Sequence, residues 1–260
     1  MNEKNNIGFF WQSANNPCAV KMNLQQLKKV YPTAPISFWE DLKTPEYADI
    51  CASYGVRKRN VFRIADDNEH NAFGASKNLI GTVNYLNRIY ISLMTTLKDV
   101  TWFCMMEDDV WVVNQVIDLD SNLDWIGGLG REWPEETVKN GTPKGIWCAA
   151  GGTLIKREAF LDSYMMVQDI DWVKEDNLLN NSMTYYADVA ISLLLAKNNV
   201  SWNPHSYWQH WANFDVSIEH CEVANILHNV RYWYKHPLDQ LSEVNQTEEV
   251  SKFLGEFNGH

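Results

Sequence analysis

Short apolar runs alternate with amphipathic stretches over the first 106 residues of the chain. Apolar runs of strand length indicate strands, and apolar residues at helical spacing indicate helices. The predicted strands are 7–11, 35–39, 60–65 and 100–106, and the predicted helices between them are 19–30, 45–54 and 78–97. This alternation is typical of an α/β fold with a mostly parallel sheet, which binds ligands beyond the carboxyl ends of its strands.

The pattern after residue 113 is less regular. We expect a strand at 145–155 interrupted by Gly151 and Gly152, a polar connection at 169–184 and a strongly apolar helix at 189–196. A strand-like stretch follows at 200–202, then an aromatic, His-rich stretch that runs to Pro237. The last twenty residues predict an acidic amphipathic helix.

Three consecutive carboxylates, Glu107, Asp108 and Asp109, interrupt the long apolar run at 100–113. Two like charges about 4 Å apart repel by about 4 kcal/mol at an effective dielectric constant near 20, so a bound divalent cation would explain the cluster. In an extended segment, Glu107 and Asp109 share one face and Asp108 takes the other. The alternative is an acidic turn that ends a buried strand, but apolar runs on both sides make a solvated turn less fitting.

Composition narrows the classes of function. A net charge of -11 and a pI near 5.1 argue against a nucleic-acid partner. No apolar run is long enough for a membrane span, the N-terminus lacks a signal-peptide pattern, and five scattered cysteines suit a reducing compartment. We therefore expect a soluble, cytoplasmic protein. The phosphate-binding loop, the dinucleotide-binding glycine motif and the hydrolase serine elbow are all absent from the sequence.

Three motifs in order resemble the metal-dependent nucleotide-sugar glycosyltransferases of the GT-A fold. They are Met-Glu-Asp-Asp-Val at 106–110, Ala-Ala-Gly-Gly-Thr-Leu at 149–154 with Lys-Arg-Glu-Ala-Phe at 156–160, and Tyr-Ala-Asp-Val-Ala at 186–190. The resemblance covers nearly the whole chain. It implies a single domain over 1–260, with a Rossmann-like nucleotide-binding half at about 1–113, an acceptor and catalytic half at about 114–240, and the C-terminal helix at 241–260.

The resemblance implies a Mn²⁺ or Mg²⁺ site. Asp109 corresponds to the main metal ligand of the family's D-x-D element, and Glu107 to the supporting position, where the family more often has Asp. A histidine near the C-terminus of the catalytic domain completes the site in many members. Five of the seven histidines lie between 205 and 236. His236 is our first choice for that ligand and His228 the second, with a structural or surface histidine as the alternative for either.

Asp188 corresponds to the general base of the inverting members. It would take the proton from an acceptor hydroxyl as that hydroxyl attacks the anomeric carbon. The alternative is a carboxylate at a helix N-terminus, stabilised by the helix dipole by roughly 0.5 to 1 kcal/mol.

The nucleotide end of the site is expected at the ends of the first strands. Gln12 and Asp41 follow the first and second strands, where the family contacts the base. Arg63 and Arg88 are candidates for pairing with phosphate or with the acidic triplet. We also count Glu107 and Asp108 among the donor-binding residues, which are therefore Gln12, Asp41, Arg63, Arg88, Glu107 and Asp108.

The expected activity is transfer of a sugar from a UDP- or GDP-sugar to a carbohydrate hydroxyl, with inversion of configuration. Two alternatives stay open. One is a metal-dependent nucleotidyl or phosphoryl transferase that uses the same carboxylates. The other is a noncatalytic carbohydrate-binding protein whose twelve tryptophans contact sugars. The sequence does not identify the sugar, the nucleotide, the acceptor or the oligomeric state.

Overall fold

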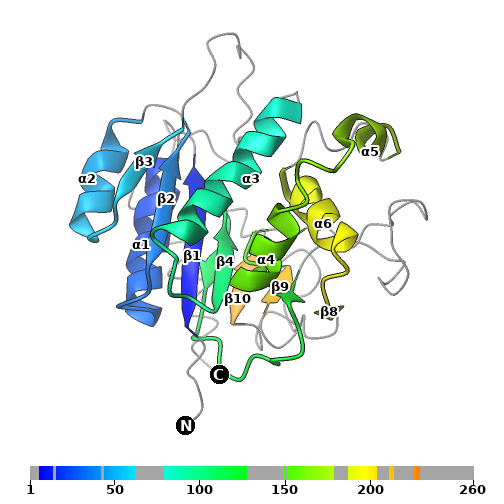
Figure 1. The fold of residues 1–260 in the computed structure, drawn as a ribbon. Helices are drawn as coiled ribbons and strands as arrows, with labels where there is room; N and C mark the ends of the chain where they lie inside the picture. The colour runs from blue at the N-terminus through cyan, green and yellow to red at the C-terminus, as the bar shows by residue number, and fades with distance from the viewer. Residues whose placement is uncertain are drawn as a thin grey trace.

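The computed structural model describes residues 6–13, 16–41, 44–61, 79–127, 149, 151–178, 187–203, 211–213 and 225–228. Within these ranges, seven strands form one sheet in the order β3-β2-β1-β4-β7-β6-β8 (Figure 1). The strands are β1 (Ile7–Ser13), β2 (Ile36–Glu40), β3 (Lys58–Asn60), β4 (Trp102–Met106), β6 (Trp125–Ile126), β7 (Leu154–Lys156) and β8 (Trp202–Asn203).

The sheet is mostly parallel, as predicted. β1 pairs in parallel with β2 and β4, β2 with β3, and β6 with β8. β7 is antiparallel to both β4 and β6. The carboxyl ends of β1, β2 and β4 therefore meet at one edge, where an open α/β sheet binds its ligands.

A smaller sheet in the order β5-β10-β9 lies beyond the end of β4. Its strands are β5 (Trp111–Val112), β9 (Trp211–Asn213) and β10 (Ile226–His228). β10 is antiparallel to β5 and parallel to β9. The sequence predicted none of these strands, because two or three residues are too few for a periodic signal and the pairing of β5 with β10 spans more than one hundred residues.

The helices are α1 (Pro17–Val30), α2 (Glu46–Ser53), α3 (Leu79–Met94), α4 (Arg157–Tyr164), α5 (Trp172–Leu178) and α6 (Ala187–Lys197). Side chains that alternate along β1 enter two separate cores. Phe9 and Trp11 pack in a core with the apolar faces of α1 and α2, whereas Phe10 packs in a second core with α3, α4 and α6. The sheet is thus covered by helices on both faces (Figure 1).

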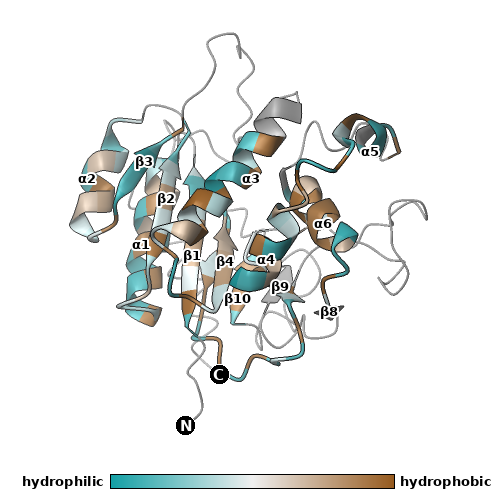
Figure 2. Ribbon diagram, viewed as in Figure 1, coloured by the Kyte–Doolittle hydropathy of each residue, from teal (hydrophilic) through white to brown (hydrophobic). Residues whose placement is uncertain are grey.

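Helices α1 and α6 show two different reasons for being helical. α1 is amphipathic, with Leu24 and Leu27 fully buried, and each contributes about 1.5 to 3 kcal/mol by burial. Asn16 caps it by accepting a hydrogen bond from the Ala19 amide at 3.4 Å, and proline occupies its first turn. α6 is apolar along almost its whole length (Figure 2). It is buried from residue 189 to 196.

Two predicted segments differ from the structure, and a third lies outside the described residues. The third strand is Lys58–Asn60 and not 60–65, of which 62–65 lie outside the described residues. The prediction of a polar connection at 169–184 was wrong for its first half, because Trp172–Leu178 forms α5. The predicted C-terminal helix at 241–260 lies outside the described residues. Among the helices within the described ranges, none is long and apolar enough to cross a membrane.

Candidate metal centre

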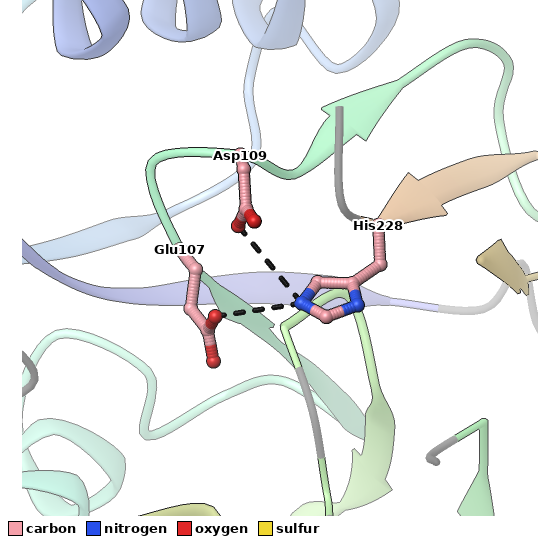
Figure 3. Close-up of side chains that lie close together, drawn as sticks. All are labelled: Glu107, Asp109 and His228. Atoms are coloured by element: carbon pink, nitrogen blue, oxygen red, sulfur yellow. Dashed lines mark ion pairs between the residues drawn. The ribbon is translucent and has the colours of Figure 1, made fainter. Parts of the chain in front are cut away.

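Three side chains from two distant segments converge just beyond the end of β4 (Figure 3). Glu107 and Asp109 lie in the turn between β4 and β5, and His228 is the last residue of β10. The Nε2 atom of His228 lies 3.5 Å from Oε2 of Glu107 and 3.9 Å from Oδ1 of Asp109. One ligand atom from each residue lies within 4.8 Å of the others, so the group can hold a metal ion.

Strand pairing explains why His228 reaches the turn at residues 107–110, which we call the acidic turn. The antiparallel register joins Ile226 to Val112 and Leu227 to Trp111. The next residue along β10, His228, therefore comes level with the turn that carries Asp109. The pairing continues at the other end, where the Val113 amide donates to the Asn225 carbonyl at 2.8 Å. His228, our second choice from the sequence, joins the two carboxylates, while His236 lies outside the described residues.

The imidazole of His228 is buried beside carboxylates. Burial lowers its pKa, but the hydrogen bond to Glu107 and the charges of Glu107 and Asp109 raise it. Asp188 raises the pKa as well, and the net result lies above the ordinary value for histidine. The carboxylates around His228 therefore favour a positive charge at this position, from either a proton or a metal cation.

Asp108 points away from this group and ties the acidic turn to β1. Its carboxylate accepts hydrogen bonds from Trp11 Nε1 at 3.1 Å and from Ser13 Oγ at 2.9 Å. Its carbonyl accepts one from Asn23 Nδ2 of α1 at 3.0 Å. Burial raises the pKa of Asp108 to about 7, with Glu107 and Asp109 adding to the rise and the bonds from Ser13 and Trp11 opposing it. No sequence pattern marks these anchoring residues.

The Gly151–Gly152 turn lies against the acidic turn and is joined to β4 by backbone hydrogen bonds. The Gly152 amide donates to the Met105 carbonyl at 2.5 Å, and the Met105 amide donates to the Thr153 carbonyl at 2.9 Å. Gly152 has a φ of 84°, a left-handed conformation that favours glycine. The predicted interruption at these glycines is therefore a turn that leads into β7.

A chain of buried polar side chains joins the ends of β1 and β2 to α3. Gln12 Nε2 donates to Asp41 Oδ2 at 3.0 Å, and Arg88 Nε donates to Gln12 Oε1 at 2.8 Å. The Arg88 guanidinium also lies over the Tyr85 ring, 5.5 Å from its centroid. The structure thus brings together three of the four residues predicted at the nucleotide end, while Arg63 lies outside the described residues.

Asp188 lies in the first turn of α6, and its side chain is half-buried. Hydrogen bonds through Ser192 connect its backbone to the segment before β7. Its Oδ1 accepts from the Val189 amide at 2.9 Å, and its carbonyl accepts from Ser192 Oγ at 2.7 Å. The same hydroxyl accepts from the Ala149 amide at 2.7 Å. Ser192, itself fully buried, therefore links the start of α6 to the segment that precedes Gly151.

Tyr85 shows that these groups share one region of the molecule. Burial raises its pKa most, and the negative charges of Glu107, Asp188 and Asp41 raise it further, while Arg88 lowers it. A single buried ring thus lies within electrostatic reach of the acidic turn, the start of α6 and the end of β2. These segments are far apart in the sequence.

The donor atoms of the centre fit a divalent cation. Two carboxylates and one imidazole suit a first-row divalent metal, and carboxylates also suit Mg²⁺. Ligand atoms bound at about 2.1 Å lie about 3 Å apart in cis and about 4 Å apart in trans, close to the separations of 3.5 Å and 3.9 Å found here. All three ligand atoms lie within 4.8 Å of one another, so side-chain rotations of Glu107, Asp109 and His228 would draw them together around one ion.

Comparisons with known proteins find similarity in solved structures. Neither the protein-family models nor the curated proteins include a match to this chain. A crystal structure of the galactosyltransferase LgtC in complex with donor and acceptor sugar analogues has 13% sequence identity and a TM-score of 0.48, and covers 94% of this chain and 95% of its own. A structure of an active-site mutant of LgtC has 14% identity and a TM-score of 0.46, with the same coverage.

Proposed function

We propose that the protein is a metal-dependent glycosyltransferase that moves a sugar from a UDP- or GDP-sugar to a carbohydrate hydroxyl. The observation that carries the proposal is the convergence of Glu107, Asp109 and His228 at the carboxyl edge of a parallel sheet. A diphosphate has two or more negative charges, so it needs a cation to enter a region already rich in carboxylates. A metal held by these three residues meets that need.

Asp109 and Glu107 would hold the ion through oxygen, and His228 through an imidazole nitrogen. The imidazole favours Mn²⁺ over Mg²⁺, because Mg²⁺ prefers oxygen ligands and keeps several waters. When bound, the ion would neutralise charge on the diphosphate leaving group. Asp108 serves a different purpose in this proposal, because its bonds to Trp11 and Ser13 keep the turn in place for its two neighbours.

The buried chain of Gln12, Asp41 and Arg88 would form the nucleotide end of the site. Gln12 and Asp41 lie at the ends of β1 and β2, and Arg88 reaches Gln12 from α3. Asp41 and Gln12 offer acceptor and donor atoms for a base or ribose, and Arg88 offers positive charge. Arg63, which follows β3 in the chain, stays a candidate for a phosphate contact.

Asp188 would act as the general base. The acceptor oxygen forms the new bond to the anomeric carbon as the bond to the nucleoside diphosphate breaks, and Asp188 receives the proton from that oxygen. Two observations support the assignment: the carboxylate lies within electrostatic reach of His228, and its backbone is fixed through Ser192. Attack in line with the departing diphosphate inverts the anomeric configuration.

The test is a panel of UDP- and GDP-sugars incubated with the protein, a mixture of carbohydrate acceptors, and either Mn²⁺ or a chelator. The proposal predicts Mn²⁺-dependent release of nucleoside diphosphate from at least one donor and a glycosylated product detected by mass spectrometry. Release of pyrophosphate instead would identify a nucleotidyltransferase. Binding of sugars without turnover of any donor would identify a carbohydrate-binding protein.

A further inference from the structure

Gly151 lies so close to the acidic turn that no side chain fits between them. A Cβ atom built on Gly151 would stand 2.6 Å from Cγ2 of Val110 and 2.9 Å from both Cγ and Cδ of Glu107. Carbon atoms in contact normally stay about 3.5 to 4.0 Å apart, so even one methyl group would force neighbouring atoms to move. Glu107 can therefore keep its position only because residue 151 has a hydrogen atom in place of a side chain.

Val110 and Glu107 differ in how easily they can give way. Val110 is fully buried in the core shared with α1 and α2, and its β-branched side chain has few alternative rotamers. Glu107 is only partly buried and rotates about three side-chain bonds. A methyl group at position 151 would therefore displace mainly Glu107, whose carboxylate is the one that lies 3.5 Å from His228.

We propose that Gly151 is a positioning residue for the metal centre. Because Gly151 has no side chain, the Glu107 carboxylate can lie within reach of the ion. The inference rests on the proposed metal-dependent function. It adds a residue that does not itself bind the ion. It predicts that Gly151→Ala weakens Mn²⁺ binding by about 10- to 100-fold, the loss typical when a support of a metal ligand is altered. The loss of Mn²⁺-binding free energy should exceed any loss in the free energy of unfolding.

The experiment is a calorimetric titration of Mn²⁺ into the wild type, Gly151→Ala and a matched control, Gly8→Ala. Gly8 is also crowded, since a Cβ there would stand 2.8 Å from Leu97 Cδ2 and 2.9 Å from Val100 Cγ1. It lies near the start of β1, away from the acidic turn at the carboxyl edge. Gly8→Ala should lower the melting temperature and leave the Mn²⁺ affinity unchanged, whereas Gly151→Ala should lower the affinity.

A double-mutant cycle with Glu107→Ala separates positioning from a general structural effect. In that background Gly151→Ala should cause no further loss of Mn²⁺ affinity, because the group it displaces is gone. An equal loss in both backgrounds would overturn the inference. If Gly151→Ala alone fails to fold, the same substitution is made in a Val110→Ala background, which removes the nearest contact and keeps the one with Glu107. Gly151→Ala should still lower the Mn²⁺ affinity in that background, and an unchanged affinity there would overturn the inference.

The proposed function and this inference fail in different ways. Absence of Mn²⁺ binding in the wild type would overturn the metal assignment and this inference with it. Wild-type binding that Gly151→Ala leaves intact would overturn only the role of Gly151.

Discussion

At the scale of residues, the acidic turn is stable because its three carboxylates have different surroundings. Asp108 is buried and bonded to Trp11 and Ser13, while Glu107 and Asp109 face His228. Division of the charges between two sides reduces their mutual repulsion, and the histidine or a cation offsets what remains. The order of residue types in the turn therefore determines which carboxylates are available to a ligand.

Metal binding should depend on pH through His228. Its folded pKa is raised above the ordinary value, so the protonated imidazole stabilises the metal-free protein below about pH 6.5, and this stabilisation is lost as the pH rises through the folded pKa. A histidine must be neutral to bind a metal ion, so the ion displaces this proton. We expect Mn²⁺ affinity to fall as the pH is lowered, with proton release on binding.

The measurement is calorimetry of Mn²⁺ binding between pH 5.5 and 8.5, repeated in two buffers with different ionisation enthalpies. His228→Ala should bind Mn²⁺ more weakly and release no proton from this position. A wild-type affinity that stays constant across the whole pH range would rule out His228 as a ligand.

At the scale of elements, long periodic segments were predictable and short paired ones were not. β1, β2, β4, α1, α3 and α6 were recognised because five or more residues repeat a strand or helix pattern. β5 and β10 have two and three residues, and their pairing depends on contacts more than one hundred positions apart. His228 was only our second choice because nothing local in the sequence marks the strand that pairs with β5, and the first choice, His236, lies outside the described residues.

Candidate side chains were easier to predict than their supports. Glu107, Asp109 and Asp188 follow from unusual charge placement in apolar surroundings and from the family resemblance. Ser13, Asn23 and the close packing of Gly151 are ordinary residues in sequence terms, and their importance arises only when β1, α1 and the turn before β7 meet. Geometry of this kind has no local signature.

The start of α6 provides a prediction about catalysis. As the base, Asp188→Asn should lower turnover by roughly 10² to 10⁴ and leave donor affinity near that of the wild type. As a helix-terminal carboxylate only, the same change should cost about 0.5 to 1 kcal/mol of stability and little activity. The measurements are donor binding by calorimetry, transfer rate with the acceptor found in the panel, and product stereochemistry by NMR.

Asp171, directly before α5, is a suitable control, because it is exposed and its carboxylate accepts from the Lys174 amide at 3.1 Å. Asp171→Asn should leave turnover unchanged. Near-normal turnover of Asp188→Asn, or a product that keeps the donor's anomeric configuration, would contradict the inverting mechanism.

At the scale of the whole molecule, the candidate site lies where the main sheet and the small sheet meet. The main sheet supplies the ends of β1, β2 and β4, with their buried polar side chains, and the small sheet supplies His228. Helices on both faces bury the sheet, so the carboxyl edge is where charged groups gather. The net charge of -11 adds to the attraction for a metal ion.

The most direct test of the central claim is calorimetric titration of UDP and GDP into the wild type and Asp109→Asn, with and without Mn²⁺. The substitution removes a charge and keeps the volume, so the fold and melting temperature should be retained. We predict that at least one nucleotide binds the wild type only with Mn²⁺ and that Asp109→Asn binds neither. Metal-dependent binding by Asp109→Asn with wild-type affinity would contradict the assignment of this turn as the metal and nucleotide site.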